Sequence, residues 1–225
     1  MRTMQPMLSA GLMVFAVSAW SVVRAASPPD AAQIAKAGNG KGAPACVACH
    51  GADGGGNAAA GYPRLAGLNA AYLLKQLDDF ASDARENPVM QPNARALTQA
   101  ERVALAAYYS AMPIPPAAAR GMPGKVSDHG PGARLAHFGR WSSKIPACIR
   151  CHGPHGVGVG KHFPPLAGQP ASYLANQLKA FKDGKRHNDP LKLMQHVSAG
   201  LSAAEINEVT AWFAAQPASV KGVTP

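Results

Sequence analysis

The sequence is poor in cysteine, in acidic residues and in long apolar runs. All four cysteines fall within two pentapeptides, so none remains to supply a thiolate ligand elsewhere. Aspartate and glutamate together number 12 against 22 lysines and arginines, which gives a formal net charge of +10. Beyond one N-terminal apolar run, no stretch is long enough to span a bilayer. At 225 residues the chain is long for one small domain and sufficient for two of about a hundred residues each.

The two cysteine-containing pentapeptides share one pattern. Residues 46–50 read CVACH, and residues 148–152 read CIRCH. A Cys-x-x-Cys-His string is typical of c-type haem attachment, in which two thiols bind the haem vinyl groups and the imidazole binds the iron. The spacing places both thiols on one helical turn, with the imidazole directly after them. We therefore predict two covalently bound haem c groups, held by these residues: Cys46, Cys49, His50, Cys148, Cys151 and His152.

Three other uses of four cysteines have to be weighed against haem attachment. They are two disulfides in an exported protein, a redox-active dithiol, and half of a zinc site. None of these requires a histidine after both second cysteines, and about a hundred residues separate the two pairs. The duplicated histidine therefore favours haem.

The N-terminal segment predicts export. Arg2 precedes an apolar run over 7–23, and small residues follow at Ala25 and Ala26. This is the pattern of a cleaved secretory signal peptide, which we assign to residues 1–26. The mature protein is expected in the periplasm, a compartment that also fits thioether attachment of haem.

The charge is distributed unequally between the two halves. Residues 27–119 contain seven basic and seven acidic side chains, whereas residues 120–225 contain thirteen basic and five acidic ones. Because the excess of lysine and arginine surrounds a haem motif in an exported chain, an acidic redox protein is a more economical partner than nucleic acid. An anionic membrane surface, bound peripherally, is the second partner considered, and a merely soluble face is the third.

The second half of the sequence repeats the first. The offset is 102 residues from Cys46 to Cys148, 101 from Tyr72 to Tyr173, and 104 from Glu101 to Glu205. Apolar periodicity and capping residues predict the following helices: 30–37, 69–80, 98–112, 132–139, 171–182 and 202–216. Residues 84–96 are expected to be irregular, the segment around Met194 a basic loop, and residues 113–131, rich in Pro, Gly and Ala, an extended linker.

At this point the chain resembles a known family. The two Cys-x-x-Cys-His motifs, the paired Pro-x-Leu-Ala-Gly strings, Tyr-Leu-x-x-Gln-Leu at 72–77 and 173–178, and the spaced methionines are similar to dihaem cytochromes c of the c4 type. The resemblance implies an all-α fold with two tandem class I cytochrome c domains, which we place at residues 27–112 and 132–225. It also implies that the carbonyl groups of Pro63 and Pro164 accept hydrogen bonds from His50 and His152.

Each iron needs a second axial ligand, and methionine and histidine are the candidates. Met90 and Met194 occupy equivalent positions, each seven residues before the leucine that leads into a capping box, and the resemblance places the ligands there. Met112 is the rival in the first half. In the second half, His196 lies two residues from Met194 and is the histidine to test, whereas His155, His162 and His187 are expected to be solvated loop residues.

Two six-coordinate irons imply electron transfer. We expect a soluble periplasmic cytochrome that carries electrons between respiratory-chain or dehydrogenase donors and a terminal oxidase or reductase, and we expect it not to be an enzyme. A dihaem peroxidase, a thiosulfate dehydrogenase, and the dedicated cytochrome subunit of a dehydrogenase complex are the alternatives.

Overall fold

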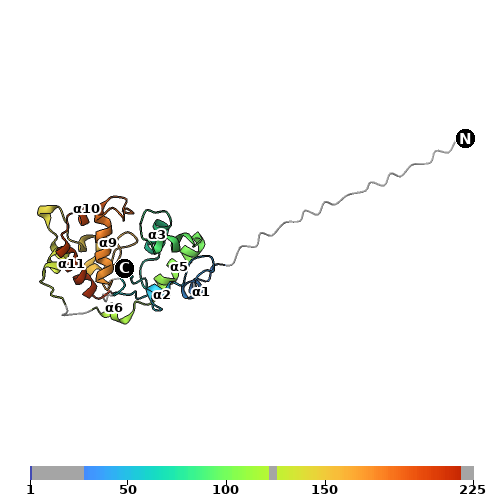
Figure 1. Cartoon of the computed structure of the whole chain (residues 1–225), viewed down its shortest axis with the longest axis horizontal. Coiled ribbons are helices and arrows are strands. Elements are labelled where there is room, and N and C mark those ends of the chain that lie inside the picture. Colours follow the sequence, from blue (N-terminus) through green and yellow to red (C-terminus); the bar gives the residue numbers. More distant parts are fainter. Residues whose placement is uncertain (2–27, 122–125, 219–225) are drawn as a thin grey trace.

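The computed structural model describes Met1 and residues 28–121 and 126–218, and it divides the chain into two helical halves. Figure 1 shows the halves side by side along the longest axis, with residues before the linker on one side and those after it on the other. Within the described residues there are helices and isolated β-bridges but no β-strand. The prediction of an all-α chain is therefore confirmed, whereas the predicted signal peptide lies, except for Met1, outside the described residues.

The two halves repeat one set of helices. The first half contains α1 (Ala31–Ala37), α2 (Val47–His50), α3 (Ala70–Ala81), α4 (Met90–Arg95) and α5 (Gln99–Ala111). The second half contains α7 (Pro131–Phe138), η1 (Trp141–Ser143), α8 (Ile149–His152), η2 (Pro154–Gly156), α9 (Ala171–Lys182), α10 (Leu193–Ala199) and α11 (Ala203–Ala215). One further helix, α6 (Pro116–Arg120), lies between the halves in sequence.

The helices begin where side chains satisfy free backbone N–H groups. The Asn69 side chain accepts hydrogen bonds from the backbone N–H groups of Ala71 and Tyr72 at the start of α3. Thr98 and Glu101 form a capping box at α5, and Ser202 and Glu205 form the equivalent one at α11. These caps fix the first residues of the long helices that form each core.

Three segments differ from the sequence-based expectation, because each is partly helical. Residues 84–96 contain α4, whose first turn includes Pro92; the proline is tolerated there because its missing N–H would have no intrahelical partner. The Asn87 side chain caps this helix by accepting from Met90 N–H. The segment around Met194 likewise contains α10, and the linker contains α6 with Pro116 at its first position.

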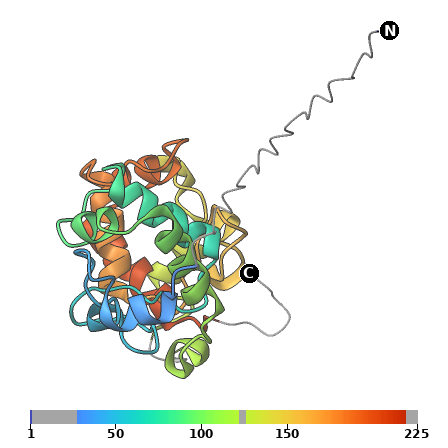
Figure 2. The same ribbon diagram turned by 90° about the vertical axis from the view of Figure 1, so that its right-hand side faces the viewer.

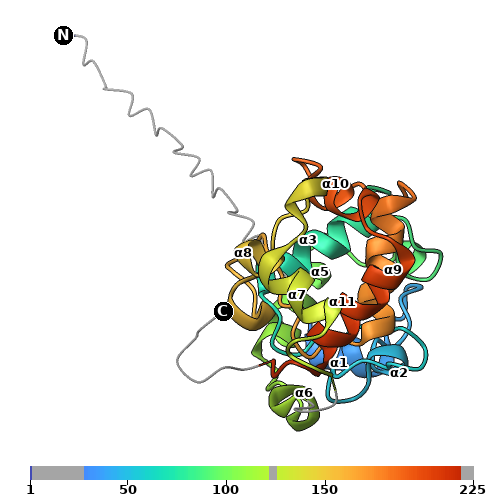
Figure 3. The same cartoon turned by 90° about the vertical axis from the view of Figure 1, so that its left-hand side faces the viewer.

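Each half encloses its own apolar core. In the first half α3 packs against α5, with Leu73, Leu105 and Tyr109 buried between them. In the second half α11 packs against α7 and α9, with Trp212 at the centre. Figure 2 views the molecule from the side of the first half, and Figure 3 shows α7, α9 and α11 together on the opposite side.

The linker helix α6 lies against the second half. The Ala118 carbonyl oxygen accepts a 2.9 Å hydrogen bond from Ala218 N–H, just after α11. The linker is therefore fixed at this point rather than extended through solvent. Among the described residues, no helix has both the length and the hydropathy needed to cross a membrane.

Candidate functional site

The first site is built on the short helix α2. This helix places two half-buried thiols, Cys46 and Cys49, next to His50, whose side chain is 6% exposed. Nδ1 of His50 lies 3.0 Å from the Pro63 carbonyl oxygen. Because a carbonyl only accepts, Nδ1 carries the proton and Nε2 keeps a free lone pair. Burial lowers the pKa of His50, which keeps the imidazole neutral and able to bind a metal.

The second site has the same arrangement on α8. His152 is 7% exposed, and its Nδ1 lies 2.8 Å from the Pro164 carbonyl oxygen. Burial lowers the pKa of His152 as well. Cys148 and Cys151 are free and half-buried beside it. Each half therefore presents two thiols and one oriented, neutral imidazole.

The thiols do not fit the rival uses of the motif. All four cysteines are free. Burial raises the pKa of Cys46, and it raises the pKa of Cys148 to about 11, so both thiols are protonated at neutral pH. A redox-active dithiol instead needs a thiol whose pKa is lowered, so that the thiolate forms near neutral pH. Among the described residues no cluster of three or more His, Cys, Asp or Glu side chains is arranged to hold a metal ion.

A cavity of about 530 Å³ opens over the first site. Cys46, Cys49 and His50 line it together with Met90 from α4 and mainly apolar side chains from α3 and α5. Residues of the second half, including Tyr173 and Arg186, close its far side. The cavity thus joins the two thiols and the imidazole to a methionine and to the boundary between the halves.

Two buried arginines lie at this boundary in equivalent positions. Arg85 donates to Gln76, and across the boundary to the Tyr173 hydroxyl at 3.0 Å and to Gln177 at 2.6 Å. Arg186 donates to Gln177 at 3.1 Å and across the boundary to Gln76 at 3.1 Å.

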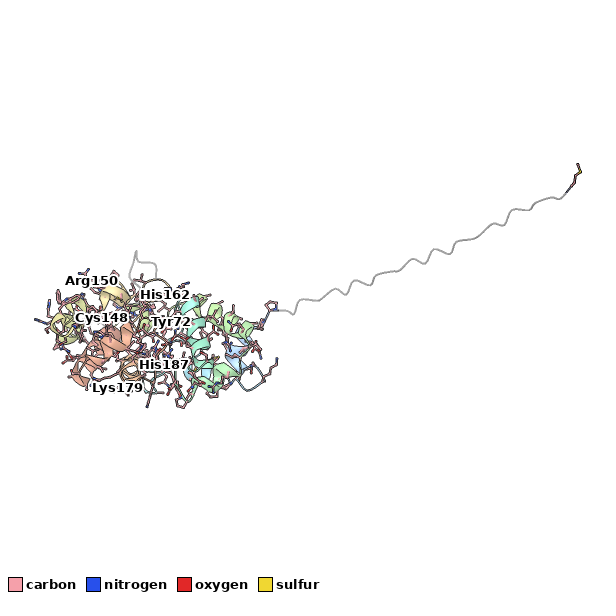
Figure 4. The ribbon with its side chains drawn as sticks, turned by 90° about the horizontal axis from the view of Figure 1, so that it is seen from above. Tyr72, Cys148, Arg150, His162, Lys179 and His187 are labelled. Carbon is pink, nitrogen blue, oxygen red and sulfur yellow. The ribbon has the colours of Figure 1, made fainter. Side chains whose placement is uncertain are left out.

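Figure 4 labels Tyr72 and His187 where the two halves meet. Arg186 donates to the Tyr72 hydroxyl at 3.5 Å, and His187 N–H donates to the Ala84 carbonyl at 3.3 Å. Each half therefore donates hydrogen bonds from one buried arginine to a tyrosine and a glutamine of the other half, and these contacts hold the halves together.

The guanidinium groups of Arg85 and Arg186 have no carboxylate partner among the described residues. They are 5% and 7% exposed, and each stacks over a phenylalanine ring of its own half, Phe80 or Phe181, at 4.4 Å from the ring centroid. Buried charges are normally paired. Two buried cations at the edge of an apolar cavity therefore call for an anionic group of the ligand.

The residues present fit a haem. The thiols are neutral and accessible for thioether bonds, and the imidazole presents Nε2. The cavity is apolar, as the macrocycle requires, and the unpaired guanidinium groups suit its two carboxylates. The same thiols and imidazole recur in the second half.

The structure separates the methionines and histidines proposed as ligands. Met90 lines the cavity, whereas Met112 packs against the core of the first half. Met194 is the second residue of α10, where its N–H donates to the Asp189 carboxylate. His196 lies exposed on the same helix, and the other three histidines named above are also exposed. The ligand assignment to Met90 and Met194 stays a prediction.

The sequence did not predict the polar contacts between the two halves. We call these residues the polar boundary: Tyr72, Gln76, Arg85, Tyr173, Gln177 and Arg186. Arg85 and Arg186 are offset by 101 residues, the same offset as the tyrosines and phenylalanines around them. The glutamines belong to the repeated Tyr-Leu-x-x-Gln-Leu string. A search for repeated polar residues, and not only for repeated ligands and caps, finds these side chains.

Comparison with known proteins identifies relatives. A family model described as Cytochrome c matches residues 31–112 and 143–215. A thiosulfate dehydrogenase electron acceptor of Stutzerimonas stutzeri is 54% identical over 170 residues, which cover 76% of this chain and 78% of that protein.

Two solved structures are also similar. Reduced recombinant cytochrome c4 from Pseudomonas stutzeri has a TM-score of 0.68 and 33% identity, covering 76% of this chain and 93% of its own. The thiosulfate dehydrogenase of Marichromatium purpuratum has a TM-score of 0.76 and 44% identity, covering 84% of this chain. This chain spans only 40% of that enzyme's chain.

These matches confirm the predicted fold of two cytochrome c domains and the predicted pair of covalently bound haem c groups. They also correct one prediction. The chain was predicted to be no enzyme, with thiosulfate dehydrogenase only a less favoured alternative. That classification is wrong, because a relative 54% identical to this chain is named a thiosulfate dehydrogenase electron acceptor, and 84% of this chain matches part of a solved thiosulfate dehydrogenase.

Proposed function

The chain belongs to the cytochrome c family as a two-domain member of the c4 type, and from this premise we propose that it accepts electrons from a thiosulfate dehydrogenase. The observation that carries the proposal is the 54% identity to a thiosulfate dehydrogenase electron acceptor. As a dihaem cytochrome it transfers electrons. Export to the periplasm, through the signal peptide assigned to residues 1–26, is part of the proposal.

The haems supply one-electron exchange between ferric and ferrous iron. The residues of the chain hold them and set their environment. The cysteines would attach the groups, and His50 and His152 would bind the irons through Nε2, since the Pro63 and Pro164 carbonyls orient their rings. We assign Met90 and Met194 as the second protein ligands, because Met90 lines the cavity of the first site and Met194 occupies the equivalent helix in the second half.

The boundary residues keep the two sites in a fixed relation. Hydrogen bonds from Arg85 and Arg186 cross between the halves, and Ser172 Oγ donates to the Ala58 carbonyl at 2.7 Å. We assign the two guanidinium groups to the haem carboxylates. Both groups lie at the boundary between the halves and would hold carboxylates of a bound haem there.

Replacing either boundary arginine is expected to destabilise the holoprotein. Arg85→Met and Arg186→Met each leave a buried carboxylate without its cation, so the free energy of unfolding falls by about 3 kcal/mol, as is typical when one partner of a buried pair is removed. The control is Arg95→Met. Arg95 pairs with Asp83 on the surface, where both side chains are about half exposed, and such pairs contribute at most about 1 kcal/mol. Denaturant unfolding of the three variants tests this; equal losses for Arg85→Met and Arg95→Met contradict it.

The proposed electron donor is expected to dock on the basic second half. Lys179, Lys182, Lys185 and Lys192 are exposed there, around α9 and α10. Figure 4 labels Lys179 on the surface of this half. Charge of one sign steers an oppositely charged protein and makes the association rate depend on salt.

Reduction by the enzyme tests the proposed function. The full-length holoprotein is mixed with a thiosulfate dehydrogenase and thiosulfate, and haem reduction is followed optically. We expect both haems to be reduced only when enzyme and substrate are both present, at a rate that falls as ionic strength rises. A mixture of holoprotein and thiosulfate without the enzyme measures any oxidation of thiosulfate by the chain itself. The proposal is contradicted if the haems are reduced no faster with enzyme and thiosulfate than with thiosulfate alone.

Charge reversal locates the docking face. Lys179→Glu combined with Lys192→Glu is expected to slow reduction at low salt by about tenfold or more, because rim charges act mainly on the association rate. Lys36→Glu combined with Lys41→Glu is the matched control on the first half, where both lysines are exposed. An equal effect of the two variants contradicts docking on the second half.

A further inference from the structure

Arg64 lies next to the carbonyl that orients the first imidazole, and it is completely buried. It directly follows Pro63, and its relative exposure is 0%. No ion pair among the described residues includes it. An unpaired cation at such depth is rare, because transferring a charge out of water is costly.

The guanidinium group bridges the two halves. Its two terminal nitrogens donate to the Ala66 carbonyl at 2.5 Å and to the Ala167 carbonyl at 3.2 Å. Ala66 and Ala167 occupy the same place in the two repeated Pro-x-Leu-Ala-Gly strings. Nε has no hydrogen-bond partner. The charge therefore lies between two equivalent backbone segments and is compensated only by their dipoles.

The backbone of Arg64 is also fixed from the other half. Its N–H donates to Gln169 Oε1 at 3.0 Å, and Gln169 Nε2 donates to the Arg64 carbonyl at 2.9 Å. Gln169 is itself 3% exposed. These reciprocal bonds hold the residue in one position, so its charge cannot move away toward solvent.

The second half has no equivalent charge. Pro165 stands where the repeat would place a second arginine. Two guanidinium groups at one place between the halves would repel each other. The single guanidinium of Arg64 instead binds the equivalent backbone carbonyls of both halves. Burial lowers the pKa of Arg64 to about 10, and the side chain therefore remains charged at neutral pH.

We propose that Arg64 sets the potentials of both haems: its buried, unpaired charge, held between the segments that carry the Pro63 and Pro164 carbonyls, raises the midpoint potential of each. A ferric haem carries one more positive charge than a ferrous haem. A fixed cation nearby therefore disfavours oxidation, and burial leaves this effect poorly screened. The inference rests on the proposed function, because it assumes haems held by His50 and His152.

The test is a spectroelectrochemical titration of Arg64→Met in the full-length holoprotein. Methionine keeps most of the buried volume and removes the charge. We expect the reduction equilibrium constant of each haem to fall roughly threefold to tenfold, where tenfold corresponds to about 59 mV for a one-electron couple. Unchanged potentials in a folded variant overturn the proposal.

Two further variants separate charge from hydrogen bonding. Arg64→Gln removes the charge but keeps an amide N–H that can donate to the Ala66 or Ala167 carbonyl. It serves as the second test if Arg64→Met fails to fold, and its potentials are expected to fall as well. Arg64→Lys keeps the charge with fewer bonds, and its potentials are expected to stay near those of the wild type. A fall of equal size in Arg64→Lys assigns the effect to bonding and overturns the proposal.

Lys161→Met is the control for surface charge. Lys161 is exposed, five residues after Gly156 in the second half. Its removal is expected to shift the potentials less than twofold, and the shift is expected to vanish at high salt. A shift as large as that of Arg64→Met overturns the special role of the buried residue. A separate observation tests the methionine ligands of the proposed function: if they bind iron, the oxidised wild-type protein has a sulfur-to-iron charge-transfer absorption band. Absence of that band contradicts the ligand assignment, whereas unchanged potentials in Arg64→Met contradict the role of Arg64, so the two results are distinguishable.

Discussion

Met90→Ala is expected to lower the midpoint potential of one haem by on the order of 0.1 V or more and to leave the other almost unchanged. A thioether ligand raises the potential of a haem, and axial ligands tune haem potentials over roughly 0.8 V. The oxidised variant is also expected to lose about half of its sulfur-to-iron charge-transfer absorption. Met194→Ala should remove the other half, and the double variant should remove all of it. Optical redox titration of the three variants measures both quantities.

The matched control in the first half is Met112→Ala. Met112 packs against the core beside α5 and does not line the cavity that holds Met90 and His50. Its replacement is expected to lower the free energy of unfolding, because apolar contacts with the core are lost, and to leave the charge-transfer band intact. In the second half His196→Ala is the control, because His196 is exposed on α10 two residues from Met194. Retention of the full band in Met90→Ala, or its loss in Met112→Ala, contradicts the assignment.

The sequence predicts the parts of this fold that are set locally. Capping boxes at Thr98 and Ser202 marked the starts of α5 and α11 because the residues that form each cap lie within four positions. The haem motif is local for the same reason. The helix α4 was missed because two prolines between residues 84 and 96 suggested an irregular segment, although Pro92 occupies a first turn where it breaks no bond.

The polar boundary is a different case, because its members lie far apart in sequence. Arg64 and Gln169 are 105 residues apart, and Arg85 and Gln177 are 92 apart. The identity of an arginine does not show whether its charge is buried or solvated. The excess of basic residues in the second half was interpreted as surface charge, and no role was predicted for Arg64 or Arg85. The repeat offset identifies Arg85 and Arg186 as a pair, but Arg64 has no counterpart and emerges only from the packing of the two halves.

Trp212→Ala is expected to cause the largest loss of stability among single core substitutions. Trp212 is 1% exposed and lies at the contact of α7 and α11, with its ring 5.0 Å from His137 and 4.9 Å from Phe213. Its Nε1 donates to Asp128 at 3.2 Å. Truncating a buried tryptophan typically costs about 3–5 kcal/mol, from lost burial and the cavity left behind. Denaturant unfolding followed by circular dichroism measures the change in the free energy of unfolding.

The backbone around Trp212 cannot close over the missing ring. α7 already meets α11 so closely that a Cβ at Gly132 would lie 2.2 Å from the Glu208 carbonyl oxygen, so the helices have no room to approach further. A cavity should therefore persist in Trp212→Ala. The control is Tyr108→Ala, the equivalent position of the first half, where the side chain is only partly buried and a loss of about 1–2 kcal/mol is expected. Equal losses at the two positions would contradict the assignment of the larger loss to the packing of α7 on α11.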